Sequence, residues 1–319
     1  MALLSQQQSD RAYFEEVATR AGLDFQHFNT PVQCVDDLAR DPAAIVIADA
    51  SSAQLYSAFE NCVSDKLGLY SALVNPNNYF FVGSQPLYQL TYLHNSQIFG
   101  SYLQRNYNAD DQDFMGALFQ RFSAESAFAV EKYFSPLAKQ QVTKIKKSSE
   151  KANIVEALKE YLIRWGMNSR ATGLIANAAD ELLMNAIYAA PADALGKPLH
   201  GNTPRNTPLD MDSEHEIEFK LVHDENRIAF SVTDLYGSLD RSKLMQFIAK
   251  SYRAEDYKVK TNVPGAGLGM GEVFAHSGGM LYSWEPGVRT EAMVFYRKSH
   301  SFKEFREQFR FLSTFAVSM

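Results

Sequence analysis

Short apolar runs alternate with amphipathic segments through the first third of the chain. The clearest run, Ala-Ala-Ile-Val-Ile-Ala at residues 43–48, is rich in β-branched side chains and typical of a parallel strand buried on both faces. Segments with helical spacing lie around it, and Gly22 follows the first of them as a typical helix stop. This alternation predicts an open parallel sheet. The expected elements are helices at 11–20 and 31–40 and strands at 23–28, 43–48 and 79–82.

The apolar pattern changes in the second part of the chain. Residues 111–140 have helical spacing interrupted at Pro136, and two long amphipathic helices are expected at 154–166 and 170–190. A loop rich in Pro, Gly, Asn and Asp follows at 191–213, and loops of that length are often functional. Alternating positions beyond it predict two β-hairpins and short helices, and hence an α/β sandwich with an antiparallel-rich sheet. The hairpins are expected at 217–232 and 280–295, and the short helices at 242–248 and 272–276.

A chain of 319 residues is too long for one ordinary core, which suggests two domains. We expect a first α/β domain at 1–110, a helical linker at 111–140, an α/β sandwich domain at 141–300 and a C-terminal tail at 301–319.

The C-terminal tail has its own apolar pattern. Phe302, Phe305, Phe309 and Leu312 repeat at helical spacing with basic residues between them. We expect this face to pack on its own domain. Docking on a second subunit in a homodimer, or on a partner protein, is the alternative.

Charge and composition exclude several classes of partner. The formal net charge is -6 and there is no long Lys/Arg stripe, so neither nucleic acid nor an anionic membrane is an expected partner. No run of 18 apolar residues and no secretory signal pattern occurs, and we expect a soluble, cytoplasmic protein. Cys34 and Cys62 lack the spacing of a disulfide or zinc site and are expected to be reduced.

The second long helix carries a pair of oxygen-bearing side chains. Glu181 and Asn185, in Glu-Leu-Leu-Met-Asn, are four residues apart and therefore share a helix face about 6 Å apart along the axis. A carboxylate and an amide oxygen at that spacing can meet one small ligand. Mg²⁺ is the natural candidate, since it prefers oxygen ligands and keeps several waters.

A glycine-rich segment and a strand-end aspartate follow downstream. Gly265-Ala-Gly267-Leu268-Gly269 lets the backbone approach a phosphate closely and point N–H groups at it. Asp234 ends the strand pattern at 228–233. In this order the three features indicate a nucleotide site.

Residues 140–297 resemble the ATP-binding domain shared by histidine kinases, anti-sigma-factor serine kinases, type II topoisomerases and Hsp90 chaperones. Glu-Leu-Leu-Met-Asn matches the N box, so the resemblance implies that Asn185 holds Mg²⁺ and Glu181 orients or deprotonates the attacking group. By the same resemblance Asp234 accepts a hydrogen bond from the adenine amino group. Gly265, Gly267 and Gly269 would cradle the phosphates, with Leu268 as an apolar anchor, and Thr290 matches the late threonine beside the aspartate.

The chain departs from that family in one box. The usual Asp-x-Gly-x-Gly is Asp234-Leu-Tyr236-Gly237-Ser238 here, so the glycine is displaced to Gly237. The resemblance then implies that Asp234 would still recognise adenine, whereas the floor of the pocket would be altered. A dinucleotide fingerprint and a P-loop both fail, because the strand before the glycines and the Gly-Lys-Ser/Thr sequence are missing.

The first domain resembles a response-regulator receiver, with an unrelated α/β domain as the alternative. Asp49 ends the buried strand at the phospho-acceptor position, and Ser84 matches the switch hydroxyl. Residues 5–7 stand where an acidic metal pair is required, and no convincing Lys follows a fifth strand. We therefore expect a degenerate receiver that serves in docking or dimerisation, in which Asp49 is either a phospho-acceptor or a simple strand-end aspartate.

These features lead to two functional hypotheses. No histidine has the setting of a kinase acceptor, so the arrangement is most similar to anti-sigma-type kinases that phosphorylate Ser or Thr on a regulatory partner protein. Glu181 would then be the general base, acting with ATP and Mg²⁺. The alternative is a nucleotide-gated module in which ATP orders residues 252–264 and sets partner affinity without phosphoryl transfer.

Overall fold

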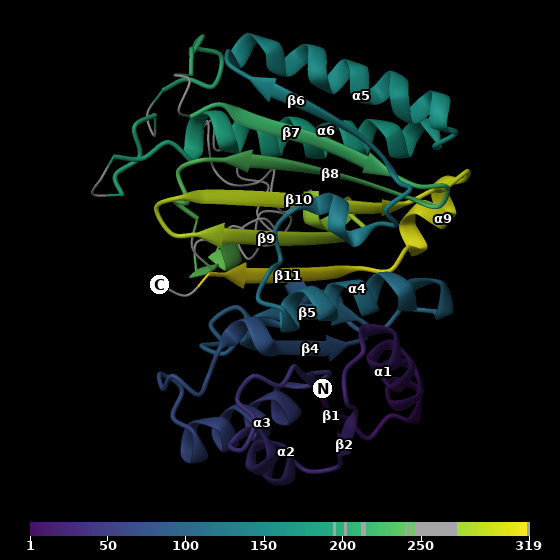
Figure 1. The fold of residues 1–319 in the computed structure, drawn as a ribbon, viewed down its shortest axis with the longest axis vertical. Helices are drawn as coiled ribbons and strands as arrows, with labels where there is room; N and C mark the ends of the chain where they lie inside the picture. Colours follow the sequence, from purple (N-terminus) through teal and green to yellow (C-terminus); the bar gives the residue numbers. More distant parts are fainter. Residues whose placement is uncertain are drawn as a thin grey trace. The chain divides into compact units, whose positions relative to one another are not determined.

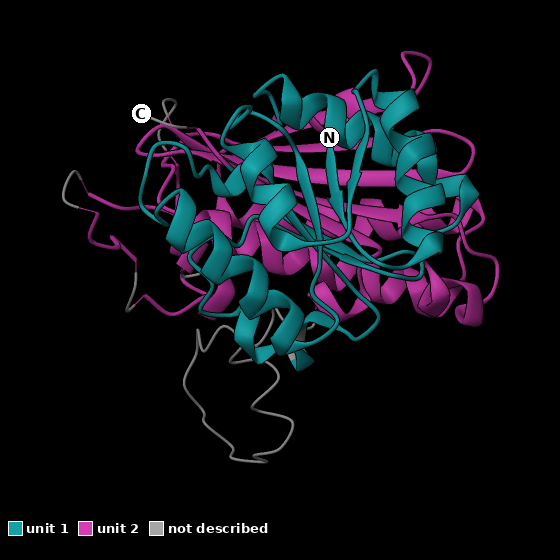
Figure 2. Cartoon of the chain, turned by 90° about the horizontal axis from the view of Figure 1, so that it is seen from below, with its two compact units in different colours: residues 1–127, 309–315 teal, residues 128–308, 316–319 magenta. Residues whose placement is uncertain are grey.

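The structure is a computed structural model, shown in Figure 1. It describes residues 1–193, 196–200, 203–211, 215–239, 241–242, 244–246 and 273–317, apart from the side chain of residue 88. The chain divides into two compact units, distinguished by colour in Figure 2. Unit 1 comprises residues 1–127 and 309–315, and unit 2 comprises residues 128–308 and 316–319.

Unit 1 contains the expected parallel sheet. Its five parallel strands lie in the order β2-β1-β3-β4-β5, and β11 pairs antiparallel with β5. This is a doubly wound order of the flavodoxin type. The strands are β1 (Ala2–Leu4), β2 (Gln26–Phe28), β3 (Val46–Asp49), β4 (Tyr79–Gly83), β5 (Ser101–Gln104) and β11 (Phe311–Ala316).

Helices α1 (Gln8–Ala21) and α4 (Gln112–Ser123) pack together, and so do α2 (Pro31–Leu38) and α3 (Ala53–Lys66) (Figure 1). Local sequence sets their ends. The Thr30 and Ser52 side chains cap α2 and α3 by accepting backbone N–H groups. Gly22 ends α1 at φ +67°, a left-handed conformation that favours glycine.

Unit 2 is an α/β sandwich. Five antiparallel strands lie in the order β6-β7-β8-β10-β9, and helices α5 and α6 pack together beside them, with α6 in contact with β8 (Figure 1). The antiparallel-rich sheet and both expected hairpins are confirmed. The elements are β6 (Lys139–Ile145), α5 (Lys151–Trp165), α6 (Ser169–Met184), β7 (Ile217–His223), β8 (Arg227–Asp234), β9 (Gly279–Glu285), β10 (Arg289–Arg297) and α9 (Phe302–Glu307).

Two segments differ from the sequence prediction. The helix expected at 111–140 ends at Ser123, and the backbone beyond it has positive φ at Glu125 and Ala129, which a continuous helix does not permit. The C-terminal helix ends at Glu307, and the apolar residues after it form strand β11, buried on both faces. A short apolar run is compatible with either element, so its spacing alone did not separate them.

No helix within the described residues is long and apolar enough to cross a membrane. Cys34 and Cys62 are both free, and Cys34 is buried.

Candidate functional site

The end of α6 carries Glu181 and Asn185. The Asn168 side chain caps the start of this helix, and the last turn passes into a π-helical turn at Asn185–Ala189. Such turns are rare and occur frequently at functional sites. The Asn185 amide lies close enough to the Glu181 carboxyl to act on its pKa, as the four-residue spacing predicts.

Glu181 is largely buried and has a cationic neighbour. Its side chain is 18% exposed, and Arg205 Nη1 lies 3.5 Å from Glu181 Oε2. Burial raises the pKa of Glu181, and Arg205 opposes that rise without cancelling it. A carboxyl group with a raised pKa is suited to accepting a proton near neutral pH.

Asp234 ends β8 in a buried position. Its Oδ1 accepts hydrogen bonds from the backbone N–H groups of Tyr236, at 3.0 Å, and Gly237, at 3.3 Å. Burial nevertheless raises the pKa of Asp234 to about 6. The carboxyl therefore carries a desolvation cost that the two backbone donors only partly offset.

Thr290 lies directly opposite Asp234 in the β8–β10 register. Its hydroxyl acts on the Asp234 carboxyl as a hydrogen-bonding neighbour that favours the charged form, although the geometry falls just short of a formed hydrogen bond. Asp234 and Thr290 thus form a buried polar pair across β8 and β10.

The glycine after Asp234 has a structural requirement. Gly237 has φ +57°, and a Cβ there would lie 2.2 Å from the carbonyl oxygen of Glu285, so no other residue fits under the β9–β10 turn. Tyr236 stacks on His215 with ring centroids 4.6 Å apart. The segment after Asp234 thus forms a close turn at Gly237.

The two parts of the site meet through one hydrogen bond. Ser238 Oγ, four residues beyond Asp234, donates to the carbonyl oxygen of Ala190 at 2.8 Å, directly after the π-helical turn. The helix end with Glu181 and Asn185 and the strand end with Asp234 therefore adjoin, as α6 and β8 in Figure 1 indicate. The predicted phosphate-binding residues Gly265, Gly267, Leu268 and Gly269 lie outside the described residues.

The described residues do not form a metal site from protein side chains alone, but the end of α6 offers an oxygen ligand of the kind that Mg²⁺ binds. The described residues contain no group of three or more His, Cys, Asp or Glu side chains that would hold an ion. Asn185 could supply an amide oxygen to Mg²⁺, with phosphate oxygens and water as the remaining ligands, while the Glu181 carboxyl lies beside it.

Unit 1 has a separate charged cluster at the carboxyl ends of its strands. Arg105 directly follows β5, and its guanidinium forms a bidentate pair with Asp10 through Nε at 2.8 Å and Nη2 at 2.7 Å. Arg105 Nη2 also lies 3.0 Å from Asp49 Oδ2. Asp10 is fully buried and Arg105 and Asp49 nearly so, with side-chain exposures of 0%, 7% and 11%.

Hydrogen bonds complete this cluster. The hydroxyls of Ser5 and Tyr107 donate to Asp10, and Ser51 Oγ accepts from Arg105 Nη1 at 2.6 Å. Burial alone would raise the pKa of Asp10, but the hydrogen bond from Arg105 and those from the two hydroxyls hold it below its usual value. The carboxylate of Asp10 is thus charged and paired.

The cluster bears on Asp49 as a phospho-acceptor. Arg105 already pairs with Asp49, and Ser51 donates to the Oδ1 atom of Asp49 from the backbone N–H at 2.9 Å. We expect Asp49 to remain unmodified when the protein is incubated with acetyl phosphate and Mg²⁺, because the carboxylate is engaged and no acidic metal pair follows β1. Intact-protein mass spectrometry gives the answer, and a gain of one phosphoryl group that Asp49→Asn abolishes would contradict this expectation.

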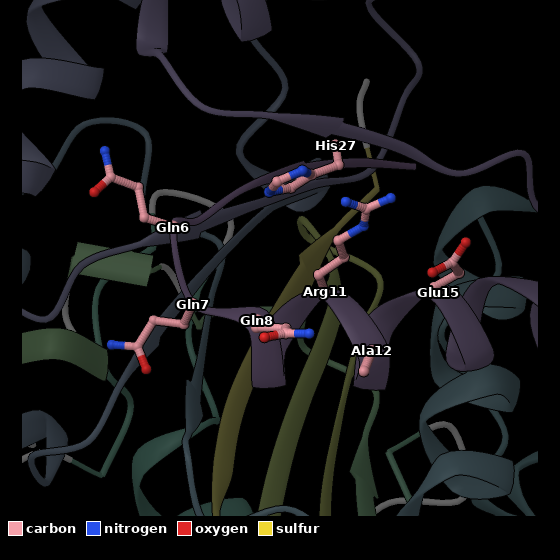
Figure 3. A pocket seen from close by; sticks show the side chains of 7 residues that line it. All are labelled: Gln6, Gln7, Gln8, Arg11, Ala12, Glu15 and His27. Carbon is pink, nitrogen blue, oxygen red and sulfur yellow. The ribbon is translucent and has the colours of Figure 1, made fainter.

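The cavity in Figure 3 lies elsewhere in unit 1. It has a volume of about 420 Å³ and is lined by Gln6, Gln7, Gln8, Arg11, Ala12, Glu15 and His27. Asp49 and Arg105 are not among these residues, and all but His27 are exposed. The cavity is therefore distinct from the charged cluster.

Sequence reasoning missed two arginines. Arg105 directly follows a four-residue strand, and a basic residue at that place was the available signal. Arg205 lies in the long loop between α6 and β7, where no periodic pattern relates it to Glu181. Only the fold brings those two side chains together.

No protein-family model matches this chain, and no curated protein matches it either.

Proposed function

We propose that unit 2 binds Mg-ATP and transfers its terminal phosphoryl group to a serine or threonine of a regulatory partner protein. One observation carries this proposal. A buried aspartate with a raised pKa stands opposite the buried threonine hydroxyl that favours its charged form, next to the helix end that bears Glu181 and Asn185. An acid whose pKa is strongly perturbed by burial is a candidate for a functional site.

Adenine suits the Asp234 end of this site. Oδ1 accepts hydrogen bonds from two backbone donors, and Oδ2 would accept one from the exocyclic amino group. The Thr290 hydroxyl can donate to a neighbouring ring nitrogen. A charged acceptor makes the stronger kind of hydrogen bond, and the bond would repay part of the cost of burying Asp234.

The phosphates would lie toward the end of α6. Asn185 would supply an oxygen to Mg²⁺, which would neutralise charge on the phosphates when bound. Gly265, Gly267 and Gly269, with Leu268, are assigned to the phosphates by resemblance alone. Glu181 is then placed to take the proton of the attacking hydroxyl.

The role of Glu181 can be tested by a conservative change. We expect Glu181→Gln to lower phosphoryl transfer about 100-fold or more while ATP affinity stays within about 3-fold, because the amide keeps the shape but cannot accept the proton. Single-turnover assays with labelled ATP and separate binding titrations give the two numbers. Asp180→Asn, one residue earlier and paired with Lys151, is the matched control and should leave transfer unchanged.

A second function is favoured by one contact. Arg205 already pairs with Glu181, and this pairing makes Glu181 a weaker base. A nucleotide-gated binding module does not need a base. Incubating the purified protein with labelled ATP and cell lysate separates the two functions. A kinase labels a discrete protein, whereas a binding module labels nothing above the level seen with Glu181→Gln.

A further inference from the structure

We propose that Arg205 is a phosphate-binding residue that exchanges Glu181 for the terminal phosphate of the nucleotide. This inference rests on the proposed function and specifies one step of it. Arg205 is thus paired with Glu181 in the nucleotide-free protein, and the pair separates when the triphosphate binds.

The contact between Arg205 and Glu181 is loose. Nη1 and Oε2 are 3.5 Å apart, at the long limit of a hydrogen bond, and the Arg205 side chain is 30% exposed. The Arg205 guanidinium has five N–H donors, and within the described residues its contact is this one ion pair with Glu181. Arginine binds phosphate oxygens through two parallel hydrogen bonds, so a phosphate offers it a better partner than one distant carboxyl oxygen.

The loop that carries Arg205 is fixed at several points. Tyr188, in the π-helical turn, donates from its hydroxyl to the carbonyl oxygen of Thr207 at 2.7 Å. Leu209 and Ser148 are joined by a backbone bond of 2.9 Å from Ser148 and a bond of 2.9 Å from the Leu209 N–H to the Ser148 hydroxyl. The backbone that follows Arg205 is therefore anchored to the π-helical turn after α6 and to Ser148.

Geometry puts the reacting phosphate within reach. A hydroxyl that gives its proton to Glu181 must lie about 2.6–3.2 Å from the carboxylate, and its oxygen about 3–3.5 Å from the phosphorus. The terminal phosphate oxygens then come within the span of a rotated Arg205 side chain, whose Nη1 now lies 3.5 Å from Glu181.

The exchange also serves the chemistry. The hydroxyl oxygen of the partner forms a bond to the terminal phosphorus, its proton goes to Glu181, and the bond to the bridging oxygen breaks with its electron pair left on ADP. Arg205 on the phosphate neutralises charge in that transition state, a role that arginine fills in other phosphoryl-transfer enzymes.

The test compares affinities for Mg-ATP and Mg-ADP by calorimetry on the full chain. We expect Arg205→Ala to lower ATP affinity about 10-fold or more and ADP affinity less than about 3-fold, because only ATP has the phosphate in question. Arg205→Lys should fall between, since lysine is a point charge without the fork. Arg164→Ala, which removes an exposed cation from the last turn of α5, is the matched control for charge.

A second variant separates binding from loop structure. Glu181→Gln frees Arg205 and should leave ATP affinity equal or higher while the preference for ATP over ADP persists. If the preference for ATP over ADP in Arg205→Ala equals that of the unmodified protein, the inference is overturned and the proposed function stands. If the unmodified protein binds neither nucleotide, the proposed function fails and this inference fails with it.

Discussion

Replacing Arg105 with alanine should destabilise the protein by about 3–5 kcal/mol. The change removes the partner of Asp10, whose side chain is fully buried, and an unpaired buried charge costs far more than a broken surface pair. Urea unfolding followed by circular dichroism measures the loss in unit 1. The double variant Asp10→Asn, Arg105→Gln should recover part of it, because it also removes the unpaired charge of Asp10.

The exposed pair between Arg20 and Asp113 provides the matched control, since its side chains are 36% and 85% exposed. Arg20→Ala should have an effect within the error of the measurement. Equal effects of Arg20→Ala and Arg105→Ala would contradict the assignment of Asp10 and Arg105 as a buried structural pair.

The same cluster sets a response to acid. The folded-state pKa of Asp10 lies below its ordinary value of 3.8, so its contribution to stability is fully present above that value and is lost as the pH falls through the folded pKa. Asp10→Asn should remove this part of the acid sensitivity.

Replacing Asp234 with asparagine should weaken ATP binding about 100-fold and make the protein more stable at pH 7.5. Asparagine keeps Oδ1 for the N–H groups of Tyr236 and Gly237 but presents an amide donor to the adenine amino group. A nucleotide titration and a thermal unfolding curve, both at pH 7.5, measure the two effects. Loss of stability with ATP affinity retained would show that Asp234 belongs to the fold and not to the site.

The sign of the stability change follows from the raised pKa of Asp234. A folded-state value of about 6 against the ordinary 3.8 means that the folded protein binds this proton more tightly than the unfolded chain. The carboxyl therefore destabilises the fold as the pH rises through about 6, by up to about 3 kcal/mol. The advantage of Asp234→Asn should accordingly shrink between about pH 7.5 and about pH 5, while the ATP affinity of the unmodified protein falls over the same interval.

The strongest patterns in the sequence predicted much of this fold. The β-branched run that contains β3 predicted a buried parallel strand, and the two amphipathic helices and both hairpins of unit 2 were predicted close to their observed places. Those segments combine a clear period with a stop or turn signal, which is why local sequence sufficed.

Short or ambiguous elements were not predicted. Strand β5 has only four residues, too few for a period, and its place in the sheet depends on pairing with β4 and β11. Helix α3 was also missed, although Tyr56, Phe59 and Val63 lie buried at helical spacing within it. That signal was present in the sequence.

The site was predictable where it is local and not where it depends on distant contacts. Glu181 and Asn185 adjoin because one helical turn separates them. The pairing of Thr290 with Asp234 requires the register of β8 and β10, and the contact of Arg205 with Glu181 requires a loop folded back on the helix end. Neither contact can be predicted from the separation of the two residues in the sequence.

A titration of the full-length protein with Mg-ATP and with Mg-GTP, each repeated with EDTA, tests the central claim most directly. Guanine has a carbonyl oxygen where adenine has its amino group, so the Asp234 carboxylate should reject it. We predict that ATP binds at least about 10-fold more tightly than GTP and that EDTA weakens ATP binding. Equal affinity for the two nucleotides, or no binding of ATP with Mg²⁺ present, would contradict the account.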